Sequence, residues 1–242
     1  MRILFIVKNG AMHALSWHFA RSSQVSRVFC MPGNAGTVGL DKCENVAMPQ
    51  TIEEMVEWAE SQSIDLTIPI TESLLVEGIV DAFEERGLRI FGPRLADIRF
   101  ENDRHFAKRF LLGAGIATPP YRWFDDPNRA LEHARSIGQD VFVKTNGLVR
   151  GGGSAPCNSQ EEVEAAIQTM MVDWKFGGAG EKIIIEEWAR GEEVVFPLLL
   201  GKMIGDGVFV GLLPSAQIYR GFGEEDTTPQ TAGMGGIAPA EV

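Results

Sequence analysis

Short apolar runs alternate with stretches of helical periodicity through the first hundred residues. The apolar runs, typical of buried strands, occupy residues 3–7, 28–31, 66–70 and 89–91. The helical stretches occupy residues 11–21, 51–61 and 72–86. Strands that alternate with helices indicate a parallel sheet with helices on both faces. The pattern therefore predicts an α/β fold for this part of the chain.

Two local signals refine the helix predictions. Thr51 stands just before the second helical stretch and Glu54 follows three residues later, which is the pattern of a capping box. Gly87 follows the third stretch and is expected to end that helix.

Polar and glycine-rich segments follow three of the predicted strands. They are Asn9-Gly10, residues 32–37 and Thr71-Glu72. Ligands of parallel sheets usually bind beyond the carboxyl ends of the strands. These segments are therefore candidates for a binding site.

The pattern changes after residue 98. Helices are predicted over residues 103–113, 127–137 and 159–171. Strands are predicted over residues 141–144, 183–187, 194–200 and 207–213, the last two as an antiparallel pair. Residues 118–120 are expected to be a linker, and residues 221–236, rich in Gly and Thr, are expected to form a loop. Such a long loop is unusual inside a small domain and suggests a fragment or a shortened protein.

Composition narrows the class of protein. The 242 residues carry 22 Lys and Arg against 33 Asp and Glu, a net charge of −11, and 45% are hydrophobic. This composition excludes wholesale disorder, and the acidity argues against a nucleic-acid binder, though not against a local phosphate site. Cys30, Cys43 and Cys157 are odd in number and widely spaced, which favours a reducing compartment over a disulfide framework. The chain lacks the apolar pattern of a membrane span or a signal peptide, so we expect a soluble cytoplasmic protein.

A glycine-rich loop follows the predicted strand that ends at Lys144. Its glycines are Gly147, Gly151, Gly152 and Gly153. Glycines let backbone N–H groups approach phosphate oxygens, and Lys144 and Arg150 would add positive charge. The loop fits neither common phosphate-loop motif, so a phosphate site and a plain hairpin turn both remain open.

Two pairs of adjacent glutamates form a second candidate, Glu186-Glu187 and Glu192-Glu193. Neighbouring strand residues face opposite ways, so each pair offers one carboxylate to a given site. Such a carboxylate could hydrogen-bond a ribose or hold Mg²⁺, and the alternative is a solvated strand end. Residues 226–236 are a third candidate, because their hydroxyls and carboxylate suit a small polar substrate; the alternative is a disordered tail.

The histidines give weaker signals. His13 follows the first loop, and His18, on the same helix, is expected to be structural. No pair of histidines has metal-ligand spacing, and no motif of a serine or cysteine nucleophile is present. The metal ligands therefore stay unassigned.

Several of these segments, taken together, resemble one known family. They are residues 32–37, 65–68, 90–93, the loop after Lys144, and residues 185–188, 191–193 and 226–235. In order and spacing they are similar to the glycinamide ribonucleotide synthetase family, the phosphoribosylamine–glycine ligases, along essentially the whole chain. The resemblance implies a Rossmann-like N-terminal domain that is followed along the chain by an ATP-grasp fold.

The resemblance also implies a division into parts. Residues 1–98 would form the N-terminal α/β substrate domain with a parallel sheet. Residues 99–121 would be a linker helix of the central domain, and residues 122–190 the ATP-grasp lid. Residues 191–242 would begin a central ATP-grasp domain that is incomplete here, with the Mg²⁺ ligands of the family beyond Val242.

The family's reaction supplies the expected cofactors and substrates. ATP, with Mg²⁺, phosphorylates the carboxylate of glycine, and the amine of phosphoribosylamine then attacks the acyl phosphate. The implied partners are small molecules, with no nucleic acid and no membrane, and with a second chain or a second copy as an open possibility.

Matching the motifs position by position gives the implied site residues. The nucleotide would contact Arg104, Lys144, Gly151, Gly152, Gly153, Glu186, Glu187, Trp188 and Glu193. The amine and the amino acid would contact Asn9, Gly10, His13, Pro32, Gly33, Asn34, Glu72, Asp226, Thr227, Thr231, Gly233 and Met234. Asp226 and Arg150 would be the catalytic residues.

Some positions depart from the family pattern. The usual arginine and glutamate of the first loop are Ala11 and Met12, a lid lysine is Gly152, and a lysine before the linker is Arg104. These changes leave three readings open: the same ligase, a ligase with a changed substrate, or a shortened homologue that binds nucleotide or a partner without catalysis. An oxidoreductase is disfavoured, because Asn9-Gly10-Ala11 supplies no dinucleotide fingerprint.

Overall fold

The computed structural model describes residues 1–242 except 8, 139, 150–151, 190, 192, 203–206, 222–229 and 241–242. The chain divides into two compact units. Unit 1 contains Met1–Thr118 and Asn146–Leu148, and unit 2 contains Pro119–Thr145 and Val149–Val242. The first boundary lies between Thr118 and Pro119, inside the predicted linker.

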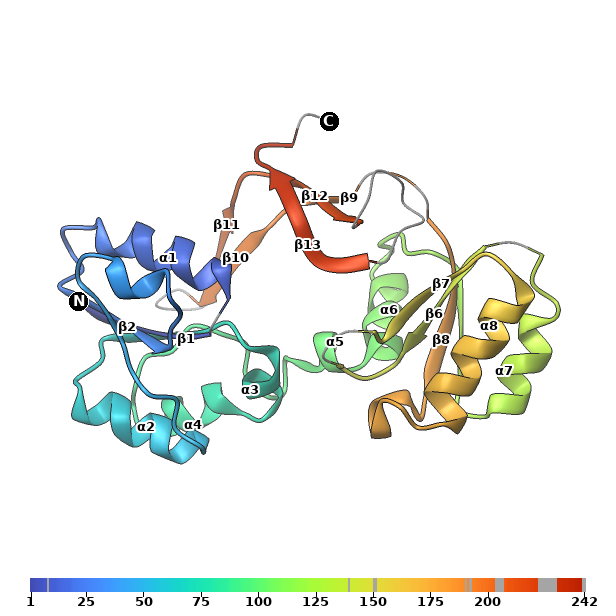
Figure 1. Ribbon diagram of the computed structural model, residues 1–242, viewed down its shortest axis with the longest axis horizontal. Coiled ribbons are helices and arrows are strands. Elements are labelled where there is room, and N and C mark those ends of the chain that lie inside the picture. The colour runs from blue at the N-terminus through green and yellow to red at the C-terminus, as the bar shows by residue number, and fades with distance from the viewer. Residues whose placement is uncertain are drawn as a thin grey trace. The chain divides into compact units, whose positions relative to one another are not determined.

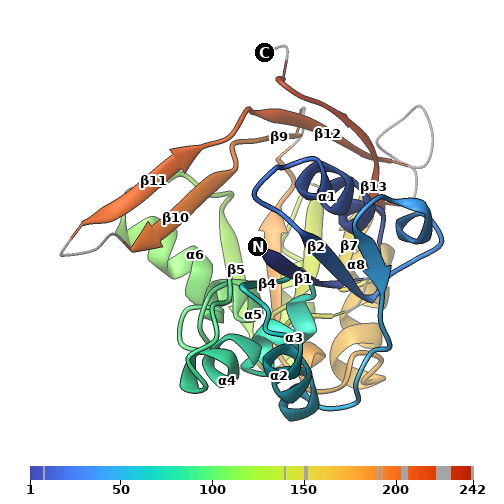
Figure 2. The same cartoon turned by 90° about the vertical axis from the view of Figure 1, so that its left-hand side faces the viewer.

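Unit 1 is built on a four-stranded parallel sheet. Its strands are β1 (Arg2–Val7), β2 (Arg27–Pro32), β3 (Cys43–Asn45) and β4 (Leu66–Pro69), in the order β3-β2-β1-β4. The predicted parallel α/β sheet is thus confirmed, and Figure 2 shows its strands β1, β2 and β4 from a second direction. Sequence reasoning missed β3, because three half-buried residues make no apolar run.

Helices cover both faces of this sheet (Figure 1). On one face lies α1 (Gly10–Ala20), where Met12 packs with Ile3 and Phe5. On the other face lie α2 (Ile52–Ser61) and α4 (Ile79–Glu85), which pack against Leu4 and Ile6. Alternate residues of β1 therefore enter opposite cores, as the pleat of a strand requires.

The predicted helix over 72–86 is wrong in its middle. The structure has two helices there, α3 (Glu72–Val76) and α4, separated at Gly78 with φ +88°. A left-handed residue interrupts helical hydrogen bonding, and glycine adopts this conformation at little cost. The predicted strand at 89–91 is also wrong, because only Ile90 forms an isolated bridge, to Thr67.

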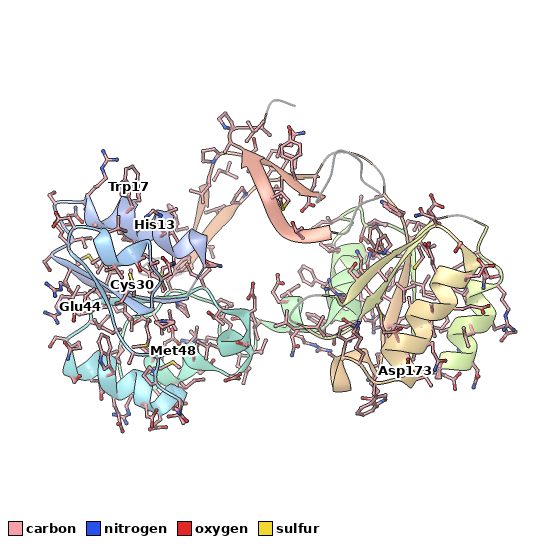
Figure 3. The ribbon with its side chains drawn as sticks, viewed as in Figure 1. His13, Trp17, Cys30, Glu44, Met48 and Asp173 are labelled. Atoms are coloured by element: carbon pink, nitrogen blue, oxygen red, sulfur yellow. The ribbon has the colours of Figure 1, made fainter. Side chains whose placement is uncertain are left out.

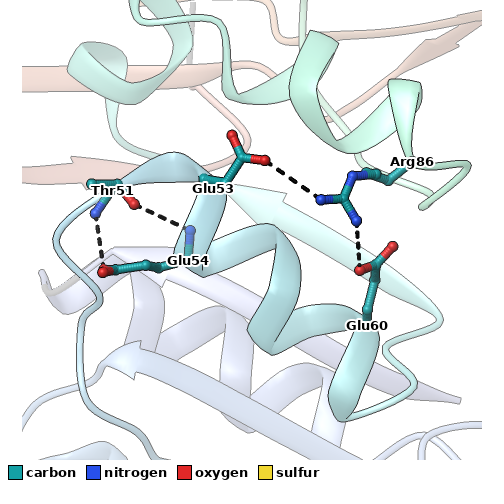
Figure 4. Close-up of polar contacts among 5 residues, drawn as sticks. All are labelled: Thr51, Glu53, Glu54, Glu60 and Arg86. Atoms are coloured by element: carbon teal, nitrogen blue, oxygen red, sulfur yellow. Dashed lines mark hydrogen bonds and ion pairs between the residues drawn. The ribbon is translucent and has the colours of Figure 1, made fainter.

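A capping box begins α2, as predicted (Figure 4). The Thr51 hydroxyl accepts a hydrogen bond from the Glu54 N–H at 3.2 Å, and the Glu54 carboxylate accepts one from the Thr51 N–H at 3.3 Å. Arg86, just after α4, pairs with Glu53 and Glu60 of α2. These exposed ion pairs add little stability, so α2 relies on its cap and its buried face.

Unit 1 ends with α5 (Arg99–Asn102) and α6 (Arg104–Gly113), the second as predicted. A short 3-10 turn, η1 (Thr37–Gly39), follows β2. All three cysteines are free; Cys30 is buried in the sheet beside α1, as Figure 3 shows. Among the described residues, no helix has both the length and the apolar character needed to cross a membrane.

Unit 2 contains a four-stranded antiparallel sheet with two helices on one face. Its strands are β5 (Tyr121–Phe124), β6 (Val141–Thr145), β7 (Ser154–Cys157) and β8 (Ile183–Glu187), in the order β5-β8-β6-β7. The helices are α7 (Pro127–Ala134) and α8 (Gln160–Ile167). Val143 and Ile185 belong to the core beneath the helices, so alternate residues such as Lys144 and Glu186 lie on the opposite face.

Two predicted helices are shorter than expected. The helix predicted over 127–137 ends at Ala134, and the one over 159–171 ends at Ile167. The chain continues from Ile167 into a π-helical turn, η2 (Gln168–Val172), and later into a 3-10 turn, η3 (Gly177–Gly180). The buried Met170 and Met171 continue the apolar pattern through the turn, and this pattern accounts for the longer prediction.

The last strands correct two predictions. Residues 194–200 form two strands, β9 (Glu193–Val195) and β10 (Leu198–Lys202), separated at Pro197, which has no N–H to donate. Residues 230–237 form β13 (Gln230–Ile237), although a loop was predicted there. The remaining strands are β11 (Val208–Leu212), paired antiparallel with β10 as predicted, and β12 (Ala216–Gly221), which lies between β13 and β9.

Candidate functional site

Lys144 and Glu186 form an ion pair on the face of the unit 2 sheet that the helices leave uncovered. Lys144 is on β6 and Glu186 is on the adjacent β8, where it lies opposite Phe142. The Lys144 Nζ donates a hydrogen bond to Oε1 of Glu186. Only 24% of the Lys144 side chain and 6% of the Glu186 side chain are exposed. The sequence predicted both residues, and the fold brings them together.

Aromatic rings flank this ion pair. The Lys144 Nζ lies 4.9 Å from the centroid of the Phe142 ring, and the Phe142 and Trp188 rings are 4.7 Å apart between centroids. A cation, a carboxylate and two flat apolar rings are thus adjacent on one face. Rings can pack against a purine base, and a lysine can contact phosphate oxygens. Sequence reasoning missed Phe142, although its alternation with Lys144 on the strand was the signal that could have identified it.

Glu187 belongs to the opposite face. It lies directly across from Val141, which is buried in the core beneath the helices. The expectation that adjacent glutamates face opposite ways is therefore confirmed for Glu186 and Glu187. The Glu187 carboxylate is separate from the Lys144 pair.

The glycine-rich loop joins β6 and β7 as an antiparallel hairpin connection. The Thr145 N–H donates to the Gly153 carbonyl at 2.8 Å, and Gly152 has φ +74°. A Cβ on Gly153 would lie 2.1 Å from Cγ2 of Val149 and 2.7 Å from Oγ1 of Thr145, so these two side chains leave no space for a larger residue there. The predicted residues Arg150 and Gly151 lie outside the described residues.

Asn146 of the same loop belongs to unit 1 and holds the start of α6. Its carbonyl accepts from the Arg104 N–H at 3.1 Å, and its Oδ1 accepts from the His105 N–H at 2.9 Å. Its side-chain amide donates to Asp103 at 3.1 Å. Burial raises the pKa of Asp103, but hydrogen bonds from the Phe106 N–H, Asn146 and Arg99 outweigh it, so the pKa lies below its usual value.

A second group of predicted residues gathers in unit 1, at the carboxyl ends of β1 and β2. Asn9 caps α1 by accepting from the Met12 N–H at 3.2 Å, and its carbonyl accepts from the Asn34 side chain at 3.1 Å. Asn34 Oδ1 also accepts from the Gly36 and Thr37 N–H groups, at 2.9 and 3.2 Å. These bonds fold residues 34–37 back toward the start of α1.

His13 and Gly33 show how tightly this loop is packed. A Cβ on Gly36 would lie 2.9 Å from Cδ2 of His13, which Figure 3 places on α1. Gly33 has φ +79°, and a Cβ there would lie 2.2 Å from the Asn45 side chain. The peptide bond before Pro32 is cis. The predicted residues Asn9, Gly10, His13, Pro32, Gly33 and Asn34 are therefore adjacent.

Glu72 lies at the same edge of the sheet. It is the first residue of α3, which begins three residues after the end of β4, and β4 is the neighbour of β1. The Thr71 hydroxyl donates to the Ile6 carbonyl at 3.2 Å, which holds the start of α3 against the end of β1. All three polar strand ends identified in the sequence thus lie at one edge.

The remaining predicted residues lie on the last strands. Thr231, Gly233 and Met234 are on β13, where Met234 is 55% exposed, and Glu193 begins β9. Asp226 and Thr227 lie outside the described residues. In the part of the chain that the structure describes, no group of three or more His, Cys, Asp or Glu side chains could hold a metal ion.

Two family models match the chain. The model described as "Phosphoribosylglycinamide synthetase, N domain" matches residues 1–101. The model described as "Phosphoribosylglycinamide synthetase, ATP-grasp (A) domain" matches residues 102–242.

Curated relatives named phosphoribosylamine–glycine ligase are similar along the whole chain. The protein from Pasteurella multocida (strain Pm70) is 40% identical over 243 aligned residues, and that from Escherichia coli (strain K12) is 39% identical. Both alignments cover 100% of this chain and 56% of the relative. The chain thus spans a little over half the length of these relatives.

Solved structures agree on the fold. A phosphoribosylamine–glycine ligase from Thermotoga maritima matches with a TM-score of 0.79 at 24% identity, covering 100% of this chain and 56% of that one. A biotin carboxylase–beta-gamma-ATP complex from Campylobacter jejuni matches with a TM-score of 0.68 at 16% identity, covering 91% of this chain and 51% of that one. The two family models together span the chain, and the model that matches residues 102–242 alone covers more than half of it, so the chain belongs to the phosphoribosylglycinamide synthetase family.

Proposed function

We propose that this chain forms the nucleotide-binding and amine-binding part of an ATP-dependent carboxylate–amine ligase that joins glycine to phosphoribosylamine. The observation that carries the proposal is the ion pair of Lys144 and Glu186, with aromatic rings beside it. The curated relatives bear the name of this ligase. Because the chain spans 56% of their length, the activity of the whole protein is part of the proposal.

The proposed nucleotide face consists of Lys144, Glu186, Phe142 and Trp188 on the uncovered side of the unit 2 sheet. The chemical groups of these residues suit ATP. Lys144 supplies a cation that suits phosphate oxygens, and it donates a hydrogen bond to Glu186. Phe142 and Trp188 offer apolar rings for the purine base. Gly152 and Gly153 add no side chain of their own to the loop after β6, which favours approach of a phosphate to their backbone N–H groups. We include Arg104, Arg150, Gly151 and Glu193 on the strength of the motif match alone.

In the proposed reaction, ATP is a substrate that supplies a phosphoryl group. An oxygen of the glycine carboxylate forms a bond to the γ-phosphorus as the bond to ADP breaks, which turns the carboxylate into an acyl phosphate. The amine nitrogen of phosphoribosylamine then forms a bond to the acyl carbon, phosphate leaves, and the nitrogen loses a proton. The described residues do not form a metal centre, so no step is assigned to Mg²⁺.

The proposed amine site is the edge of the unit 1 sheet. The hydrogen bonds among Asn9, Asn34 and Thr37 hold this loop in one shape, and a preformed loop loses little conformational entropy when a ligand binds. His13 and the backbone around Gly33 would contact the phosphoribosyl group. Glu72, at the end of the neighbouring strand, would contact a hydroxyl or the amine.

ADP release tests the proposed reaction. The chain is incubated with Mg·ATP, with or without glycine and freshly generated phosphoribosylamine. The proposal predicts ADP only when both substrates are present, because the amine is needed to complete turnover. ADP that forms equally without the amine would contradict the proposed ligase.

A second candidate function is nucleotide binding without catalysis. Gly152 favours it, because the family pattern has a lysine at this position and the φ of +74° here suits glycine. A folded chain that binds Mg·ATP but releases no ADP with both substrates would support this second function over the first.

A further inference from the structure

A cavity of about 400 Å³ opens in unit 2 beside the end of α7. Its polar lining consists of Tyr121 and Arg122 of β5, His133 of α7, Ser136 after that helix, and Glu186 and Glu187 at the end of β8. Glu186 is the partner of Lys144, whose ion pair lies on the opposite face of the sheet. Glu187, which the family resemblance groups with the nucleotide contacts, lies on the helix-bearing face.

Strand register brings two opposite charges to this cavity. Arg122 lies across from Ile185, and Glu187 lies across from Val141; both partners are buried in the core beneath α7 and α8. Arg122 and Glu187 are therefore diagonal neighbours on the helix-bearing face. The backbone positions of diagonal neighbours on an antiparallel sheet lie roughly 7–8 Å apart, so one small molecule in the cavity can contact both side chains.

Among the residues that the structure describes, neither the Arg122 guanidinium nor the Glu187 carboxylate forms an ion pair with another side chain. No ion pair within 4.0 Å involves Arg122 or Glu187 there. Both side chains are exposed, so neither charge pays a large desolvation cost in the free protein.

His133 and Ser136 add a neutral, hydrogen-bonding part to the lining of the cavity. The His133 ring packs against Phe124, with centroids 5.3 Å apart, and the Ser136 hydroxyl donates to the His133 carbonyl at 2.7 Å. Burial, and then the charge of Arg122, lower the pKa of His133, so its ring is neutral at pH 7. This part of the lining thus adds no net charge to the cavity.

We propose that this cavity binds a small zwitterion of the α-amino-acid class. Arg122 would pair with the carboxylate of the ligand, and Glu187 would pair with its ammonium group. A simple anion would meet the repulsion of Glu187, and a simple cation would meet that of Arg122. Only a molecule that carries both charges can form an ion pair with Arg122 and with Glu187 at the same time. The site requires no ATP and is independent of the proposed ligase reaction.

NMR of the histidine rings tests this site. L-alanine is the probe. Acetate, which carries only the negative charge, and ethylammonium, which carries only the positive charge, are the comparison ligands. All three are titrated at constant ionic strength. The His133 ring signals should shift saturably with alanine. Each comparison ligand should bind at least about tenfold more weakly, because it loses one ion pair and meets one repulsion.

Variants locate the site. Arg122→Gln and Glu187→Gln should each abolish the saturable shift, while Arg129→Gln, on the same helix as His133, should leave it unchanged. Backbone NMR spectra show whether each variant is folded. The proposal is overturned if wild type shows no saturable shift up to tens of millimolar alanine, or if acetate binds as tightly as alanine. It is also overturned if Mg·ATP displaces alanine, because the shift would then originate at the nucleotide face.

Discussion

Lys144 and Glu186 form an ion pair across the adjacent strands β6 and β8, and the carboxylate is the more deeply buried of the two. Only 6% of the Glu186 side chain is exposed, so its charge depends on the lysine and not on water. The ion pair is therefore expected to contribute to the stability of unit 2 and is also part of the proposed nucleotide site. One lysine pairs with a buried carboxylate, and the same lysine is the proposed contact of the nucleotide phosphates.

Lys144→Met should destabilise unit 2. The variant leaves the Glu186 carboxylate buried without its cation, and losing a charge-assisted hydrogen bond costs about 1–3 kcal/mol. Urea denaturation measures the change. Lys175→Met, which removes an exposed lysine of the same unit, should change the free energy of unfolding by less than about 0.5 kcal/mol. Equal losses in the two variants would show that the ion pair has no structural role.

Thr51→Ala should remove the cap of α2. The Glu54 N–H loses its acceptor, and losing such a cap costs about 1 kcal/mol. Ser23→Ala is the control, because Ser23 is exposed and outside the cap. Thermal unfolding should give a lower Tm for Thr51→Ala than for Ser23→Ala, and identical Tm values would contradict the capping role.

Gly33→Ala should disrupt the proposed amine site. Its φ of +79° disfavours a side chain, and the new Cβ would overlap the Asn45 amide, so we expect a loss of roughly 2 kcal/mol. Gly39→Ala is the matched control, because a Cβ at Gly39 meets nothing within 4 Å. Chemical denaturation of both variants measures the difference. If Gly33→Ala is as stable as Gly39→Ala, the loop is not held as described.

Arg122→Gln should raise the pKa of His133. Burial lowers this pKa most, and the positive charge of Arg122 lowers it further, so removing that charge moves the pKa up while leaving it below the ordinary value. An NMR titration of the His133 ring measures both values. In the wild type the folded pKa lies below the unfolded one, so this histidine contributes stability that is lost as pH falls. An unchanged or lower pKa in the variant would contradict the described geometry.

The exposed strand β11 should promote self-association. Val208, Phe209, Val210 and Leu212 are each more than half exposed, and apolar strands of this kind pair with one another. Light scattering should show a molar mass that rises with protein concentration, and Val210→Lys should reduce the rise. Val38→Lys, at an exposed apolar position in unit 1, should not. A monomer at all concentrations would contradict this expectation.

The sequence predicted the elements whose signals are local. The apolar run of β1 and the Thr51 cap are read directly from neighbouring residues, and both are confirmed. The break at Gly78 was missed because the apolar periodicity continues across it. Strand β13 was missed because its glycines suggest a loop, whereas backbone pairing of Gly235 with Tyr219 needs no side chain.

In the candidate site, too, local sequence signals identified some residues, whereas residues that meet only through tertiary packing were missed. Lys144 and Glu186 stood out because of their motifs, and the fold pairs them. Arg122 and His133 gave no signal, because they meet only through the register of β5 with β8 and the packing of α7. Contacts set by tertiary packing are not visible in the spacing of residues along the chain.

Calorimetry of Mg·ATP binding tests the central claim most directly, that Lys144 and Glu186 mark the nucleotide face. We predict that the wild-type chain binds one Mg·ATP, that folded Lys144→Met binds at least about tenfold more weakly because a direct contact to the nucleotide is lost, and that Lys175→Met binds as wild type. Equal affinity of Lys144→Met and wild type would contradict the claim.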